Sequence, residues 1–203
     1  MTFAIAHRGS SDPARENTLA AFAAAARLGA TWVELDVRAS ADGVPIVVHD
    51  APGRITAAER PDWMPTLVEA LDHCAGLGLG VVVEVKEVGV APATSVELAG
   101  RDQPLVVSSF HPVALDVVTG VDRALLLAPG ADVEAGIRIA GGLGCRQLHP
   151  HGSLVTPEVA ACGLEVVPWT VNERRHLEKM RDLHVHAVIT DDVPLANELF
   201  RGR

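Results

Sequence analysis

The sequence predicts a (β/α)8 barrel, the TIM-barrel fold, and three observations support this. The chain has 203 residues, enough for one domain with a substantial core, so we expect a single barrel over residues 1–203. Short β-rich apolar runs alternate with helical-looking stretches along the whole chain. About eight such runs are present, the number that closes a barrel. A doubly wound open sheet is the alternative that the same alternation allows.

The eight predicted strands are short apolar runs of the kind typical of buried strands. The first opens almost at Met1 and leads directly into His7 and Arg8. The predicted strands are Phe3–Ala6, Trp32–Arg38, Gly80–Lys86, Leu105–Ser109, Ala124–Ala128, Arg146–His149, Glu165–Val171 and Ala187–Thr190. An additional hairpin is expected at Ile46–Val48, because Asp42-Gly43 favours a tight turn.

The predicted helices fill the intervals between these strands. Apolar residues at helical spacing and a stop at Gly29 define the first, with Asn17 or Thr18 as its N-cap. The predicted helices are Thr18–Leu28, Thr66–Cys74, Pro112–Thr119, Asp132–Gly141, Pro157–Ala161, Glu173–Leu183 and Pro194–Phe200. The interval from Lys86 to Leu105 offers only a short helix near Ser95–Gly100, so the third helix of the barrel is expected to be truncated.

Composition narrows the function classes. The net charge of −9 argues against nucleic-acid binding, which normally requires a basic face. We expect no membrane span, because no apolar run approaches about 18 residues, and no signal peptide ahead of the first strand. The cysteines, Cys74, Cys145 and Cys162, are odd in number and lack paired spacing. They predict reduced thiols and a cytoplasmic protein.

Charged residues occur on two of the apolar strands. Glu34 and Asp36 share one face of their strand, because side chains alternate along a strand. Glu84 and Lys86 repeat the same spacing on the next strand. Such carboxylates would point into the barrel, where they repel one another unless cations are present.

Two interpretations of these acids remain. Arg8 and Lys86 could pair with them as a structural ion cluster, or the acids could bind a divalent cation such as Mg²⁺ or Ca²⁺, which prefer oxygen ligands. In the second case three negative charges, two positive side chains and a dication leave a net charge of about +1. That charge would attract a phosphodiester anion.

Two histidines lie at the ends of apolar runs, His7 after the first strand and His49 after Val44–Val48. Imidazoles suit general acid–base catalysis near neutral pH. In a diester displacement one could accept a proton from the nucleophile while the other donates a proton to the leaving alkoxide.

The combined motifs resemble the glycerophosphodiester phosphodiesterase family. They are AHRG at 6–9, ENTLAAF at 16–22, GATWVELDV at 29–37, DGVPIVVHD at 42–50, MPTLVEALD at 64–72, VEVK at 83–86, PWTVN at 168–172 and VITD at 188–191. The resemblance implies a TIM barrel and metal-dependent hydrolysis of glycerophosphodiesters to glycerol 3-phosphate and an alcohol, within lipid and glycerol metabolism.

The resemblance also implies roles for individual residues. His7 and His49 match the acid–base pair, and Arg8 and Lys86 match the phosphate-contacting cations. Trp169 matches an aromatic residue near the substrate. The implied ligands of Mg²⁺ or Ca²⁺ are Glu34, Asp36 and Glu84. Glu16 and Asn17 match a motif that braces the first loop.

The chain departs from the family pattern in two segments. Residues 51–63 stand where relatives usually carry a longer insertion over the active site, and residues 87–104 are also short. This leaves two alternatives to a small glycerophosphodiester substrate. One is a larger diester, such as a lysophospholipid or a phosphoinositide, and the other is a barrel that binds a phosphate ligand without catalysis.

Overall fold

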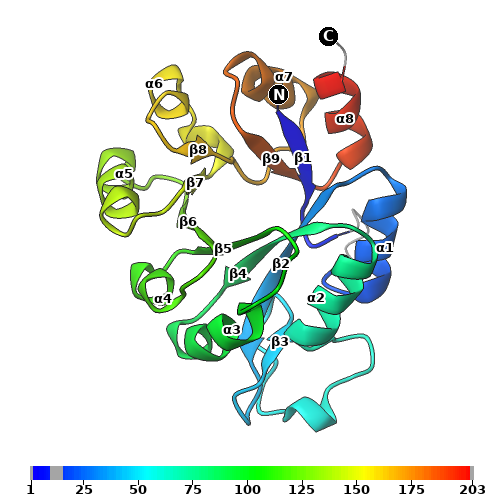
Figure 1. The fold of residues 1–203 in the computed structure, drawn as a ribbon. Helices are drawn as coiled ribbons and strands as arrows, with labels where there is room; N and C mark the ends of the chain where they lie inside the picture. The colour runs from blue at the N-terminus through cyan, green and yellow to red at the C-terminus, as the bar shows by residue number, and fades with distance from the viewer. Residues whose placement is uncertain (1, 10–15, 202–203) are drawn as a thin grey trace.

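Parallel strands form a ring, and helices cover its outer side (Figure 1). The structure, a computed structural model, describes residues 2–9 and 16–201. The hydrogen-bonded order is β8-β7-β6-β5-β4-β2-β1-β9. The strands are β1 (Phe3–Ala6), β2 (Trp32–Ala39), β4 (Gly80–Val85), β5 (Leu105–Ser109), β6 (Asp122–Leu127), β7 (Gln147–Pro150), β8 (Glu165–Val166) and β9 (Ala187–Thr190).

The two ends of this order meet and make the sheet a barrel. The backbone N–H of His186 donates to the carbonyl of Val166, and that of Ile189 donates to the carbonyl of Pro168, both at 2.9 Å. The N–H of Val171 in turn donates to the carbonyl of Ile189 at 3.0 Å. The predicted (β/α)8 barrel is therefore confirmed, and the doubly wound open sheet is wrong.

Alternation along each strand separates two apolar cores. Val33, Leu35 and Val37 of β2 belong to the large core between the strands and the helices. Ile5, Val82 and Val106 belong to a smaller core inside the ring. Glu34 and Asp36 alternate with the outer set, so the structure confirms that both point into the barrel.

The helices are α1 (Leu19–Arg27), α2 (Leu67–Gly76), α3 (Ala91–Leu98), α4 (Pro112–Val117), α5 (Val133–Gly142), α6 (Pro157–Ala160), α7 (Arg174–Asp182) and α8 (Val193–Arg201). Side-chain caps fix where several of them begin. Thr18 is the N-cap of α1 and accepts a hydrogen bond from the N–H of Ala21. Among residues 2–9 and 16–201, every helix is too short or too polar to cross a bilayer.

Several predicted boundaries shift by one or two residues, and two predicted elements differ more. The third helix is short, as expected, but α3 begins at Ala91 rather than Ser95 and follows a 3₁₀ turn at Val88–Val90. Pro92 fits its first turn, where no N–H partner is needed. The eighth strand is regular only over Glu165–Val166. Beyond it, Pro168 has no N–H for the ladder, although its carbonyl still accepts from β9.

The predicted hairpin forms beside β2. Strand β3 (Pro45–Val47) pairs antiparallel with β2, and Gly43 in the turn has a φ of 80°. The segment between β3 and α2 then runs outside the ring of strands (Figure 1). Its regular structure is a single 3₁₀ turn at Ala57–Glu59.

Candidate active site

Three carboxylates meet inside the barrel. Glu34, Asp36 and Glu84 each offer one oxygen, and these oxygens all lie within 4.8 Å of one another. The parallel register of β2 and β4 places Asp36 directly beside Glu84. Glu34 and Asp36 are almost fully buried, with 3% and 1% of their surface exposed. The spacing along two neighbouring strands thus brings the predicted acids together.

Two cations contact this cluster. The Nζ atom of Lys86 lies 3.1 Å from Oδ1 of Asp36 and 2.7 Å from Oε1 of Glu84. The Nε atom of Arg8 lies 3.0 Å from the other oxygen of Asp36. Asn17 adds a neutral hydrogen bond, because its Nδ2 donates to Oδ2 of Asp36 at 2.8 Å. Asp36 is therefore the carboxylate that the cations and the amide surround.

The environment separates the pKa values of the acids. Burial, together with the charges of Asp36 and Glu84, raises the pKa of Glu34 well above its usual value. Burial also raises the pKa of Glu84, with Asp36 contributing in the same direction. Burial alone would raise the pKa of Asp36 too, but Lys86 and Arg8 outweigh it and hold that pKa below its usual value. Arg8 acts on Glu34 as well, but its charge and its N–H only partly offset the rise in the pKa of Glu34.

The residues at this position fit a divalent cation. The Oε1 atom of Glu34 is buried and has no hydrogen-bond partner among the described residues. A dication bound by Glu34, Asp36 and Glu84 would satisfy that oxygen and offset the repulsion among the three carboxylates. Carboxylate oxygens are the ligands that hard cations such as Mg²⁺ and Ca²⁺ prefer.

The turn after β1 holds Arg8 in an unusual backbone conformation. Its φ is +52°, which costs a residue with a side chain about 1 kcal/mol or more. In this conformation its N–H donates to Oε2 of Glu34 at 3.1 Å. Its guanidinium also pairs with Glu16 at 3.0 and 3.1 Å. Glu16 and Asn17 thus contact the ends of β1 and β2.

His7 is oriented by a carboxylate from the far end of the chain. Its Nδ1 atom lies 2.7 Å from Oδ1 of Asp191. The Nδ2 of Asn172 donates to the other oxygen of Asp191 at 2.6 Å, and the Oδ1 of Asn172 accepts from the N–H of Asp191 at 2.9 Å. A hydrogen bond from His7 lowers the pKa of Asp191, so this carboxylate is charged at neutral pH.

From the sequence alone no catalytic role was assigned to Asp191, although this residue closes the VITD motif at 188–191. Asp192 accepts from the N–H of Leu195 at 3.0 Å. Asp191 instead contacts His7, because β1 and β9 are neighbours in the barrel. The sequence does show that Asp191 directly follows the last strand, just as His7 directly follows the first.

His49 approaches the site from the hairpin. Its Nδ1 lies 2.9 Å from Oδ1 of Asp50, a carboxylate whose side chain is 94% exposed. The N–H of the preceding Val48 donates to the carbonyl of Asp36 at 2.9 Å, and Arg38 donates to the carbonyl of His49. The hairpin therefore holds the backbone of His49 beside Asp36 of β2.

A family comparison covers nearly the whole barrel. The sequence model of the glycerophosphoryl diester phosphodiesterase family matches residues 7–73 and 53–195. The chain belongs to this family. The matched region contains each of the residues described above, from His7 to Asp191.

Individual phosphodiesterases of the family are similar in length to this chain. A glycerophosphodiester phosphodiesterase of Caldanaerobacter subterraneus is 29% identical, with 94% of each chain covered. A probable glycerophosphodiester phosphodiesterase 2 of Mycobacterium tuberculosis is 27% identical, over 98% of this chain and 91% of its own.

Solved structures of relatives superpose closely. An Oleispira antarctica phosphodiesterase, in complex with the product sn-glycerol-3-phosphate, has a TM-score of 0.85 at 28% identity, covering 100% of this chain and 98% of its own. A glycerophosphodiester phosphodiesterase of Thermotoga maritima has a TM-score of 0.85 at 27% identity, covering 98% of each.

In this phosphodiesterase, Trp169 belongs to an aromatic group that follows the ends of β5, β7 and β8. Its ring meets Phe110 and His151 edge to face, at centroid distances of 5.5 and 5.4 Å. Its Nε1 donates to the carbonyl of His149 at 2.9 Å. These contacts join Trp169 to the aromatic group rather than to the carboxylate cluster.

His149, in the predicted strand end before Pro150, is fully buried inside the barrel. Its Nε2 lies 2.8 Å from Oε1 of Gln147, whose Nε2 donates to Glu165. Because an amide oxygen only accepts, Nε2 of His149 carries the proton. Burial and the nearby His186 lower the pKa of His149 to about 3, so this histidine is neutral at pH 7.

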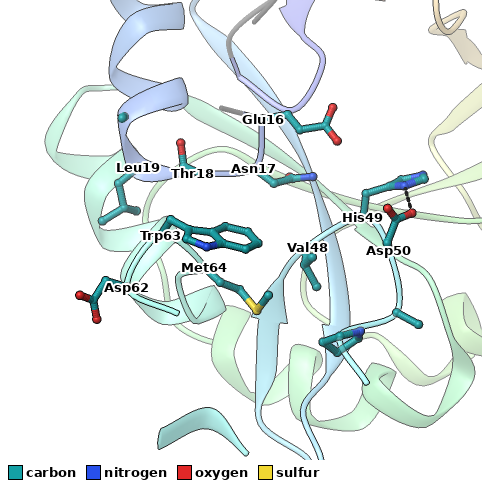
Figure 2. A pocket seen from close by; sticks show the side chains of 13 residues that line it. Glu16, Asn17, Thr18, Leu19, Val48, His49, Asp50, Asp62, Trp63 and Met64 are labelled. Atoms are coloured by element: carbon teal, nitrogen blue, oxygen red, sulfur yellow. Dashed lines mark hydrogen bonds and ion pairs between the residues drawn. The ribbon is translucent and has the colours of Figure 1, made fainter. Parts of the chain in front are cut away.

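A cavity of about 780 Å³ opens next to His49, between the start of α1, the end of the hairpin and the segment before α2 (Figure 2). One end carries polar groups, including Glu16, Asn17 and His49. Apolar side chains from α1, the hairpin and the segment before α2 line the rest. The apolar lining residues are Leu19, Ala20, Val48, Ala51, Pro52, Trp63 and Met64.

Proposed function

We propose that this chain hydrolyses glycerophosphodiesters to glycerol 3-phosphate and an alcohol. The observation that carries the proposal is the geometry of the β1, β2 and β4 segments, where two buried carboxylates, a third that is partly buried, and two cations meet beside a carboxylate-oriented histidine. The phosphodiesterase activity for which the relatives are named supports the same chemistry.

In this proposal Glu34, Asp36 and Glu84 hold a divalent cation, Mg²⁺ or Ca²⁺. When bound, the cation neutralises charge on the phosphoryl oxygens and orients the attacking hydroxyl. Arg8 and Lys86 direct their remaining N–H groups to the phosphoryl oxygens. Their ion pairs with Asp36 fix both cations before the substrate arrives, which lowers the cost of reorganisation.

His7 and His49 move the protons. Because Asp191 accepts from Nδ1 of His7, the Nε2 atom is free to accept the proton of the glycerol 2-hydroxyl. The hydroxyl oxygen then bonds to phosphorus, the bond from phosphorus to the alcohol oxygen breaks, and His49 donates a proton to that oxygen. Water opens the resulting cyclic phosphate with the roles of the two histidines reversed, so protons balance over the cycle. Trp169 is proposed to contact the substrate from the aromatic side of the barrel.

We also propose a single catalytic domain and a cytoplasmic location, with a small-molecule substrate and no nucleic-acid partner. The free cysteines, with Cys74 and Cys145 buried, support a reducing compartment. The net charge of −9 supports the absence of nucleic-acid binding.

The test is turnover of glycerophosphocholine and glycerophosphoethanolamine with Mg²⁺, Ca²⁺ or EDTA. Glycerol 3-phosphate is expected with a divalent cation and not with EDTA. His7→Ala and His49→Ala should each lower kcat at least about 100-fold, the usual contribution of a general acid or base. His176→Ala, an exposed histidine on α7, is the matched control and should leave kcat unchanged. Substrate binding without turnover would instead support a phosphate-binding barrel.

A further inference from the structure

Asn172 lies in the loop after β8, and the end of β9 connects it to His7. The N–H of Val171 donates to the carbonyl of Ile189 at 3.0 Å, which brings the loop after β8 beside the end of β9. On the other side of β9, the N–H of His7 donates to the carbonyl of Thr190 at 3.0 Å. Strand β9 lies beside β1 in the ring (Figure 1), so one short segment contacts both Asn172 and His7.

The amide of Asn172 holds both the backbone and the side chain of Asp191. Its Oδ1 accepts from the N–H of Asp191 at 2.9 Å, and its Nδ2 donates to Oδ2 of the same residue at 2.6 Å. A backbone N–H can only donate, so the amide must direct its oxygen to the backbone and its nitrogen to the carboxylate. The other carboxylate oxygen lies 2.7 Å from Nδ1 of His7. Each oxygen of Asp191 therefore has its own partner, and these two contacts fix the plane of the carboxylate.

A buried hydroxyl holds Asn172 in turn. Thr190 has no exposed surface, and its Oγ1 donates to Oδ1 of Asn172 at 3.1 Å. The same hydroxyl accepts from the N–H of Asp192 at 3.1 Å, which leaves its own proton for Asn172. Asn172 itself is exposed, so hydrogen bonds rather than packing keep its amide in place.

We propose that Asn172 is a positioning residue for catalysis, which acts through Asp191 to orient the imidazole of His7. The inference rests on the proposed function, in which Nε2 of His7 accepts the proton of the attacking hydroxyl. The side chain of Asp191 is 41% exposed, so without the donor from Asn172 its carboxylate is free to rotate and to exchange His7 for water. A catalytic group misplaced by about 1 Å can lower a rate about 100-fold.

The two ends of the amide separate positioning from a structural role. A structural brace would depend on Oδ1, which joins Asn172 to the backbone of Asp191 and to Thr190. Positioning of His7 depends on Nδ2, which donates to the carboxylate. Asn172→Asp keeps an oxygen in place of Oδ1 but replaces the donor by a second carboxylate oxygen. That oxygen would repel the carboxylate of Asp191.

The experiment measures kcat and KM for glycerophosphocholine in Asn172→Ala and Asn172→Asp. Each variant should lower kcat at least about tenfold and change KM less than about twofold, because the altered contact lies behind His7 and not at the substrate. Asn197→Ala is the matched control, because Nδ2 of Asn197 on α8 donates to the carbonyl of Gly29 at 3.2 Å, away from His7. Its kcat should change less than about twofold. Full activity in Asn172→Asp would leave only a structural brace and overturn the proposal.

A double-mutant cycle tests whether Asn172 acts through Asp191. In an Asp191→Ala background, Asn172→Ala should lower kcat less than about twofold further, because the carboxylate that it holds is gone. Losses that multiply would show that the two residues act independently and would overturn the proposal.

Turnover of no diester by the unmodified protein would instead overturn the proposed function, and nitrogen NMR of the imidazoles then tests the positioning separately. The signals of His7 are assigned by their loss in His7→Ala. They should report a proton on Nδ1 in the unmodified protein and a mixture of tautomers in Asn172→Ala. The same single tautomer in both proteins would overturn the positioning role.

Discussion

The Nδ1 atom of His7 lies 2.7 Å from Oδ1 of Asp191, and this contact joins the first and last strands of the barrel. A carboxylate accepts only, so the contact fixes the neutral imidazole with its proton on Nδ1. Asn172 holds Asp191 in turn. His49 differs, because its carboxylate partner Asp50 is exposed to water.

Asp191→Asn should lower kcat by about 100-fold or more while changing KM little, because the amide can present a donor to His7 and favour the wrong tautomer. Steady-state kinetics on glycerophosphocholine check this. Asp50→Asn is the control, with an expected loss below about threefold, because an exposed pair is screened by water. Equal losses in both variants would contradict a positioning role specific to Asp191.

Glu34→Gln should remove the stabilisation of the protein by divalent cations. The Oε1 atom of Glu34 lacks a partner among the described residues. The charges of Asp36 and Glu84 also repel a negative charge on Glu34. In EDTA the variant should unfold at the same temperature as the unmodified protein or a few degrees higher. Calorimetry with and without Mg²⁺ measures both effects. An equal Mg²⁺-induced rise in Tm for both proteins would contradict the ligand assignment.

Gly9→Ala should destabilise the barrel more than the positive φ of Gly9 alone explains. Gly9 has a φ of +88°, and an added Cβ would lie 2.8 Å from the backbone carbon of Ala21 in α1. Gly43→Ala is the control, with a φ of +80° and open space around the added Cβ. We expect losses of unfolding free energy of about 1 kcal/mol at Gly43 and about 3 kcal/mol at Gly9. Urea unfolding measures both, and similar losses would show that close packing at Gly9 has no effect.

His149 should make the barrel less stable in mild acid. The unfolded chain binds a proton at this histidine near pH 6.5, whereas burial holds the pKa of the folded state at about 3. The stabilisation that His149 contributes is therefore complete above about pH 6.5. As the pH drops below that value, this stabilisation decreases by up to about 1.4 kcal/mol per pH unit.

Urea unfolding between pH 7 and pH 5 checks this contribution. His149→Gln should show a shallower loss of unfolding free energy than the unmodified protein. The exposed His176→Ala should follow the unmodified protein. Parallel pH dependences for His149→Gln and the unmodified protein would contradict the assignment.

Much of the fold follows from local sequence patterns. The alternation of apolar runs predicts the barrel, and β1, β5 and β9 have the predicted boundaries. The boundaries of α3 and β8 were less predictable, because prolines there remove backbone donors and leave several starting points with similar local energies. Contacts with neighbouring elements then decide where each begins and ends.

The sequence by itself determined that Glu34 and Asp36 share a face, because a strand has a period of two and this needs no knowledge of neighbours. It also placed Glu84 and Lys86 together for the same reason. Only the tertiary structure decided that Lys86 and Arg8 surround Asp36 and leave an oxygen of Glu34 without a partner. It also decided that Asp191 orients His7 and that Trp63 lines a cavity beside His49. These relationships join residues far apart in the chain, and strand register and loop packing set their distances.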